Sequence, residues 1–91
     1  MRRRVVVETP KFLADLSQIG PEGYDWSDSM LGIRWYLERG PERVGDSTQD
    51  VEVRILMFDT PDGIPDLKIF FQIGPDTVQL LSVKEAEPDP F

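Results

Sequence analysis

The sequence predicts a single α+β domain in which one strand is followed by two helices and then by three strands. Three observations indicate this order. Consecutive β-branched residues lie near the start of the chain, and two segments with helical periodicity each end at a Gly-Pro pair. In the second half of the chain, apolar residues recur at every second position. We expect residues 1–86 to form the domain, and the acidic, proline-containing residues 87–91 to form a mobile tail.

A strand and a helix start are predicted near the N-terminus. Residues 2–8 include three consecutive valines, which favour a strand. Thr9 and Pro10 follow as a helix start, because threonine caps helices and proline fits the first helical turn. Gly20-Pro21 ends this helix.

A second helix is predicted to begin at Asp25 or Ser27, either of which can cap it, and to end at Gly40-Pro41. Each helix carries one apolar stripe with spacings of three and four. The first stripe comprises Phe12, Leu13, Leu16 and Ile19, and the second comprises Trp26, Met30, Ile33 and Leu37, widened by Leu31 and Trp35. The short link between the helices predicts an antiparallel hairpin.

After a polar loop over residues 41–50, the period of two predicts strands over residues 51–58, 67–73 and 77–83. Short turns join these strands, so we expect an antiparallel sheet that the first strand also joins, with the helical hairpin packed on one face. Along residues 51–58, the alternation is expected to turn one set of side chains toward the core and the other set away from it. The core set is Val51, Val53, Ile55 and Met57, and the outward set is Glu52, Arg54, Leu56 and Phe58.

Composition excludes several kinds of chemistry. The chain has no cysteine and no histidine, which removes disulfides, thiolate sites and a Ser-His-Asp arrangement. Its formal net charge of −7 disfavours general nucleic-acid binding, which depends on Lys and Arg. No apolar run is long enough for a membrane span, and we expect a cytoplasmic protein without a membrane partner, metal or cofactor.

Four segments resemble those of the RelE/ParE superfamily of bacterial toxins, which are small β-α-α-β-β-β domains. They are residues 5–12 (VVVETPKF), 53–56 (VRIL), 67–71 (LKIFF) and 78–83 (VQLLSV). The resemblance extends from Val5 to about Ala86 and rests mainly on the order and spacing of the elements. It implies a toxin component with an antitoxin partner.

The resemblance also implies a site. In the ribosome-dependent ribonucleases of that superfamily, basic residues on the sheet hold the messenger phosphate and stabilise the charge that develops during cleavage. Arg54, Lys68 and Lys84 match these positions, and Arg54 and Lys68 are expected to share one sheet face. The alternative is that these side chains form ordinary cross-strand pairs with Glu52, Glu85 or Asp66.

A second candidate surface is apolar. Leu56, Phe58 and Phe70 are expected on the face opposite the core, where they would form a partner surface or a homodimer contact. Alternatively, the helices or the C-terminal tail cover this face.

Two functions therefore stay open. The first is a RelE/ParE-like toxin, which as an enzyme would be a metal-independent endoribonuclease. The second is a non-catalytic protein-interaction module of the same fold, which binds through its acidic surface and the Leu56, Phe58 and Phe70 face.

Overall fold

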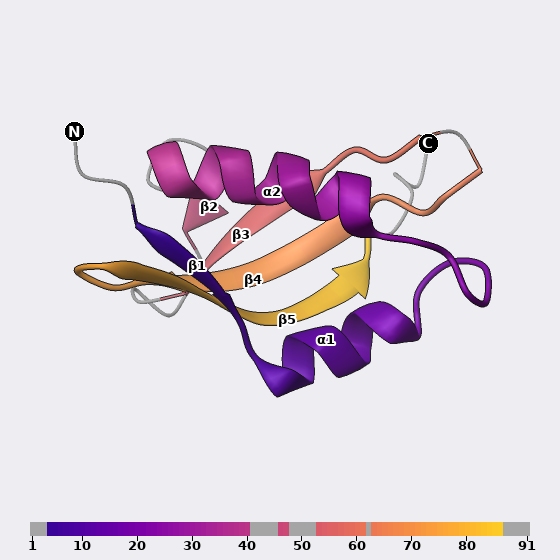
Figure 1. Ribbon diagram of the computed structural model, residues 1–91, viewed down its shortest axis with the longest axis horizontal. Helices are drawn as coiled ribbons and strands as arrows, with labels where there is room; N and C mark the ends of the chain where they lie inside the picture. Colours follow the sequence, from indigo (N-terminus) through magenta and orange to yellow (C-terminus); the bar gives the residue numbers. More distant parts are fainter. Residues whose placement is uncertain (1–3, 41–45, 48–52, 62, 87–91) are drawn as a thin grey trace.

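A five-stranded sheet covered on one face by two helices forms the protein (Figure 1). The computed structural model describes residues 4–40, 46–47, 53–61 and 63–86. The predicted tail over residues 87–91 lies outside the described residues, as does most of the predicted loop over residues 41–50. The elements are β1 (Val5–Glu8), α1 (Pro10–Ser17), α2 (Ser27–Arg39), β2 (Asp46–Ser47), β3 (Val53–Phe58), β4 (Leu67–Ile73) and β5 (Thr77–Glu85).

The strand order is β1-β5-β4-β3-β2. Strands β3, β4 and β5 pair antiparallel, as their short connections predict. Strand β1 pairs with β5 in parallel, so the sheet is mixed and the expectation of a wholly antiparallel sheet is wrong. The alternation of side chains specifies which face of a strand is buried but not its direction, since both pairings satisfy the same pattern. The α+β class and the order of the predicted elements are confirmed. Strand β2, within the predicted loop, is an addition.

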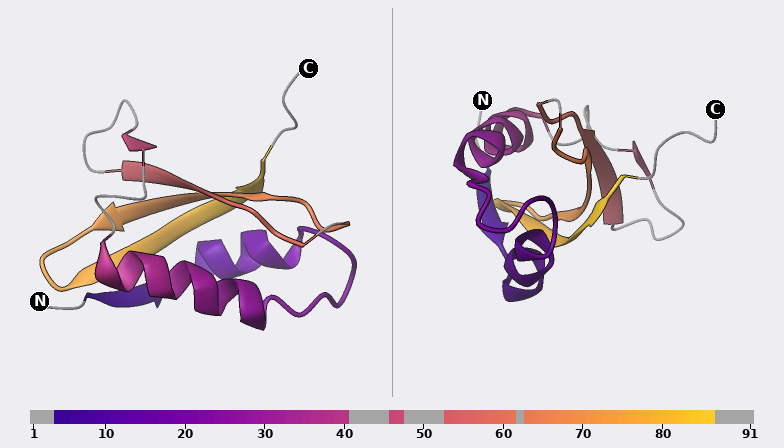
Figure 2. Two further views of the ribbon diagram at one scale, coloured as in Figure 1. Left: turned by 90° about the horizontal axis from the view of Figure 1, so that it is seen from above. Right: turned by 90° about the vertical axis from the view of Figure 1, so that its right-hand side faces the viewer.

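Both helices lie on the same face of the sheet and run in opposite directions (Figure 2). Thr9 caps α1 as predicted, because its Oγ1 accepts a hydrogen bond from the Phe12 amide at 3.3 Å. The same hydroxyl donates to the Leu80 carbonyl of β5 at 2.7 Å. This one side chain therefore fixes both the start of α1 and its position against the sheet.

Helix α2 buries the predicted stripe of Met30, Ile33 and Leu37, and Trp26 packs against the core at its start. The predicted widening of this stripe is wrong. Leu31 is 65% exposed and Trp35 is 54% exposed, because both lie on a flank of α2 that does not face the sheet. Arg39 lies over the Trp35 ring at 4.6 Å from its centroid, which shields part of that surface.

The core lies between the helices and the inner face of the sheet. Its buried residues are Phe12, Leu16, Ile19, Met30, Ile33, Leu37, Leu56, Leu67, Ile69, Phe71, Val78, Leu80 and Val83. Phe71 and Leu67 of β4 are completely buried, which confirms the predicted inner face of that strand.

Strand β3 has the opposite orientation to the predicted one. Leu56 pairs with Ile69 and is buried, and Phe58 pairs with Leu67 and packs against the core. Met57, expected in the core, is 52% exposed. Apart from Arg54, both alternating sets of β3 are apolar, so periodicity is a weak guide to the orientation of this strand. Pairing with the clearly patterned β4 decides the orientation.

Candidate functional site

A β-bulge in β5 decides which face of the sheet carries Lys84. Phe70 lies opposite Ser82, whereas the next residue of β4 lies opposite Leu80, so Leu81 is an extra residue. Leu80 is buried on the inner face. Uninterrupted alternation would turn Lys84, four positions later, toward the inner face as well. The bulge shifts the alternation by one position, and Lys84 is exposed on the face turned away from α1 and α2, called here the outer face.

Two lysines and one aromatic ring meet on the outer face. Lys68 lies directly opposite Lys84 in the antiparallel pair of β4 and β5. The Lys68 ammonium lies 5.7 Å from the centroid of the Phe70 ring, and the Lys84 ammonium lies 5.8 Å from it. Both distances fall in the range of cation–π attraction. These three residues are called the lysine–phenylalanine cluster.

The electrostatics of this cluster favour an anion. Like charges directly opposite each other on neighbouring strands repel, so the pairing of Lys68 with Lys84 is unfavourable without a counter-charge. Among the residues that the structure describes, neither lysine forms an ion pair within the range of a salt bridge. The alternative pairing with Glu85 or Asp66 is therefore not formed, and Glu52 lies outside the described residues. A phosphate between the two ammonium groups would relieve the repulsion.

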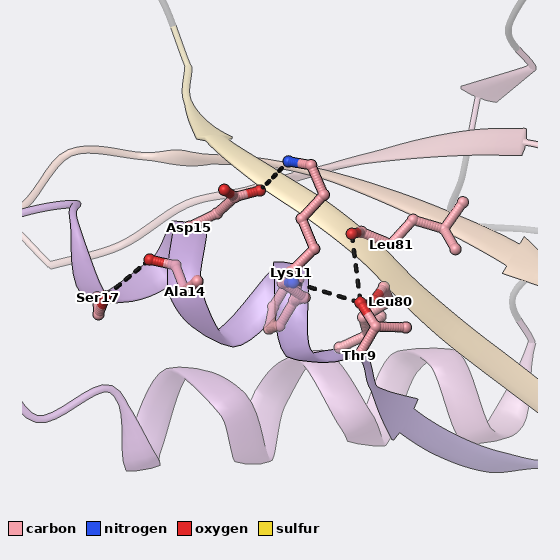
Figure 3. Close-up of polar contacts among 8 residues, drawn as sticks. Thr9, Lys11, Ala14, Asp15, Ser17, Leu80 and Leu81 are labelled. Atoms are coloured by element: carbon pink, nitrogen blue, oxygen red, sulfur yellow. Dashed lines mark hydrogen bonds and ion pairs between the residues drawn. The ribbon is translucent and has the colours of Figure 1, made fainter.

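One acidic side chain stands near the edge of the cluster. Asp15 of α1 accepts a hydrogen bond from the Lys11 ammonium at 2.8 Å (Figure 3). That bond, a backbone hydrogen bond from Val83 and the charges of Lys11 and Lys84 hold the pKa of the Asp15 carboxyl below its usual value. Asp15 therefore stays ionised and makes its main contact with Lys11, which leaves the Lys84 ammonium available to a ligand.

Arg54 does not join the two lysines. It lies opposite Phe71, which is completely buried, and so belongs to the inner face together with Leu56 and Phe58. Its Nε atom is buried, unlike the exposed Lys84 side chain. The expectation that Arg54 and Lys68 share one sheet face is therefore wrong, for the same reason that the orientation of β3 was mispredicted. Of the three basic residues singled out from the sequence, the structure brings Lys68 and Lys84 together.

The expected apolar partner surface is divided between the two faces. Leu56 and Phe58 lie on the core side, so they cannot form an outer surface with Phe70. Phe70 does lie on the outer face, opposite Ile55 of β3, and the neighbouring apolar side chain is the exposed Met57. Sequence reasoning missed Met57 because it was assigned to the core.

The outer face offers few groups for proton transfer. Histidine is absent from the whole sequence. Both tyrosines lie elsewhere: Tyr24 contacts Trp26 edge-on at 4.7 Å between the ring centroids, and Tyr36 contacts Trp35 on α2. Among the described residues of this face, acid–base chemistry would therefore depend on the lysine ammonium groups and the Ser82 hydroxyl.

Other kinds of site are not apparent in the described part of the chain. No group of three or more acidic side chains there could hold a metal ion. Asp66 instead stabilises the turn before β4 by accepting a hydrogen bond from the Thr60 amide at 2.9 Å. Within residues 4–40, 46–47, 53–61 and 63–86, neither helix has the length and apolar character needed to cross a membrane.

Comparison with known proteins gives one informative likeness. No family model matches the chain, and no curated protein matches its sequence. Among solved structures, it is similar to a chain in the crystal structure of the toxin–antitoxin complex RelBE2 from Mycobacterium tuberculosis, with a TM-score of 0.64. The match covers 92% of this chain and 99% of that chain at 17% sequence identity. At this identity the likeness shows the fold alone, and the predicted order of helices and strands is confirmed at that level.

Proposed function

We propose that the chain is a cytoplasmic, RelE-like toxin component of a toxin–antitoxin pair, and that it holds an RNA phosphate on the outer face of its sheet. The observation that carries this proposal is the meeting of Lys68 and Lys84 over the ring of Phe70. The fold shared with a chain of the RelBE2 complex supports the choice of a toxin–antitoxin component, and with it a protein partner from such a pair.

The chemistry of the cluster suits single-stranded RNA. Two ammonium groups can neutralise one phosphate or two neighbouring ones, and an aromatic ring between them offers a stacking surface for a base. This combination is tolerant of sequence, because every base has a flat face and every nucleotide a phosphate. The net charge of −7 argues against nucleic-acid binding over the whole surface, so we confine the RNA contact to this cluster.

Cleavage of the RNA needs groups that transfer protons in addition to cations that bind phosphate. In a RelE-type reaction, the 2′-oxygen attacks the phosphorus, the bond to the 5′-oxygen breaks, and one proton leaves the nucleophile while another reaches the leaving oxygen. Lys68 and Lys84 would stabilise the charge on the phosphoryl oxygens. Arg54 takes no part, because it lies on the inner face. With no imidazole or phenol on the described outer face, the cluster supports RNA binding better than cleavage.

A second candidate function is the non-catalytic interaction module. The exposed side chains of Leu31, Trp35 and Tyr36 on α2 favour it, since Trp and Tyr are enriched where proteins bind each other. In this function the chain would bind an antitoxin-like partner without acting on RNA.

The test is growth of a bacterial host after induction of the chain alone. We expect the parent chain to arrest growth, and the Lys68→Ala/Lys84→Ala variant to permit it, because the variant lacks both cations of the cluster. Arg34→Ala/Arg39→Ala is the matched control, since it removes two positive charges from α2 and leaves the outer face intact. Thermal unfolding must show that all three proteins are folded.

Primer extension on messenger RNA from the arrested cells separates two mechanisms. New 5′ ends that depend on Lys68 and Lys84 would support cleavage, whereas arrest without new ends would point to another inhibitory target. Normal growth with the folded, well-expressed parent chain would refute the toxin proposal in that host and favour the interaction module.

A further inference from the structure

A groove between the two helices forms a second candidate binding surface, away from the outer face. It has a volume of about 440 Å³, and its apolar lining consists of Leu13, Leu16, Trp26, Met30 and Leu31. Leu13 is 48% exposed and Leu31 is 65% exposed, so both walls present large apolar side chains to solvent. Apolar surface gathered in a concave site marks a binding surface more often than scattered exposed residues do.

The shape of the groove argues against a small-molecule site. Sites for small ligands usually bury about 70–90% of the ligand surface. Here the two walls are separate helices, and the side chains at their rims, Leu13 and Leu31, stand largely in solvent. A compact ligand would be covered from one side, whereas an elongated one could contact both helices.

The backbone of the groove argues for a helix rather than an extended peptide. The lining comes mainly from α1 and α2, whose peptide groups bond within their own helices, and from the short segment before α2. An extended peptide would therefore find few backbone partners, although its own N–H and C=O groups need them. A helix satisfies its backbone internally and binds through an apolar stripe.

The charge at one end of the groove indicates the charge of the occupant. Asp25 accepts hydrogen bonds from the amide and hydroxyl of Ser27, which lower the pKa of its carboxyl and keep it ionised. Among the described residues Asp25 has no ion-pair partner, and the acidic Asp28 follows in the first turn of α2. Elsewhere in the lining of the groove, Arg34 is already paired with Glu8. The remaining charge is negative, in keeping with the net charge of −7.

We propose that the groove between α1 and α2 binds a basic amphipathic helix of a partner protein. Apolar side chains on one face of that helix would pack against Leu13, Met30 and Leu31, and a Lys or Arg beside them would pair with Asp25. Helix α1 has 8 residues and spans about 12 Å, so it can contact about two turns of the occupant. The inference rests on the proposed function in that the occupant would belong to the antitoxin, but its test does not depend on toxicity.

The probe is a fluorescently labelled helical peptide of about four turns, with leucines three and four positions apart and lysines beside them. A scrambled peptide of the same composition tests the apolar stripe, and a peptide with glutamates in place of lysines tests the charge. Fluorescence anisotropy with the purified full chain measures the dissociation constants. We expect the basic peptide to bind more tightly than both of its counterparts.

Two variants locate the contact. Leu13→Asn/Leu31→Asn removes exposed apolar side chains and should weaken binding about tenfold or more. Asp25→Lys reverses the charge at the end of the groove and should abolish the preference for the basic over the acidic peptide. Val5→Asn is the matched control, because Val5 is 64% exposed on β1 and does not line the groove.

Equal binding of the basic and scrambled peptides would overturn the inference, and so would a Leu13→Asn/Leu31→Asn variant that binds as well as the parent. The same variants separate this inference from the proposed function. Lys68→Ala/Lys84→Ala should still bind the peptide, and Leu13→Asn/Leu31→Asn should still arrest growth. A variant that loses growth arrest but still binds the peptide tests the proposed role of the lysine–phenylalanine cluster alone. A variant that loses peptide binding but still arrests growth tests the proposed role of the groove alone.

Discussion

Lys68 and Lys84 lie directly opposite each other on antiparallel strands, and the ammonium groups of both lie over the same Phe70 ring. Neither forms an ion pair with a described carboxylate, so an anion bound between them would relieve their repulsion. This arrangement concentrates positive charge at one place on an otherwise acidic protein.

Removing either lysine should weaken RNA binding in a way that depends on salt. A lysine that contacts phosphate releases a counterion, so Lys68→Ala and Lys84→Ala should each lower the slope of log K against log salt by about 0.7 for single-stranded RNA. Anisotropy titrations with a short unstructured RNA at several salt concentrations measure the slope. Arg39→Ala, on α2, should leave it unchanged. An unaltered slope in both test variants would contradict phosphate contact.

The ring of Phe70 should contribute separately from the charges. Phe70→Leu keeps an apolar side chain of similar bulk but removes the stacking surface, and we expect it to cost about 1–3 kcal/mol of RNA binding. The salt slope should stay at the parent value, because no cation is lost. A change in slope without a loss of affinity at fixed salt would argue that Phe70 only positions the lysines.

The orientation of β3 can be tested by neighbouring substitutions. Leu56→Ala removes a side chain that is only 6% exposed, and we expect a loss of about 2–5 kcal/mol in the free energy of unfolding. Met57→Ala removes a side chain that is 52% exposed and should cost far less, about 0.5 kcal/mol. Urea unfolding measures both, and the reverse order would show that Met57 faces the core.

The cap of α1 should be important for stability. Thr9→Ala removes both the acceptor for the Phe12 amide and the donor to the Leu80 carbonyl, so we expect a loss of about 1–2 kcal/mol. Thr9→Ser retains the hydroxyl and should recover most of the stability. If both variants were equally destabilised, the methyl group rather than the hydroxyl would be responsible.

Asp25 should make stability depend on acid pH. Its hydrogen bonds from Ser27 lower the pKa of the carboxyl in the folded protein below the ordinary value of 3.8, so the unfolded chain binds a proton more readily. The stabilisation is present at neutral pH and is lost as the pH falls through the folded pKa. Urea unfolding over this acidic range should show a shallower pH dependence for Asp25→Asn than for the parent, and parallel curves would contradict the assignment.

Local chemistry determined much of this protein from the sequence by itself. Thr9 and Pro10 mark the start of α1, and Gly40 marks the end of α2, through backbone preferences that act over a few residues. Helix α1 itself ends at Ser17, before the predicted stop at Gly20. The helical stripes identify Phe12, Ile33 and Leu37 as core. The order of the predicted elements follows from such signals. The sequence also identified Lys68 and Lys84 as site residues, although as members of a group that included Arg54.

Only the tertiary structure decided which of these residues share a surface. Apart from Arg54, both alternating sets of β3 are apolar, so the burial of Leu56 rather than Met57 depended on pairing with β4. The direction of β1 depended on its partner β5 in the same way, because strand patterns encode faces and not directions. The bulge at Leu81 then turned Lys84 to the outer face. Each outcome depends on contacts between residues far apart in the chain, which local periodicity cannot specify.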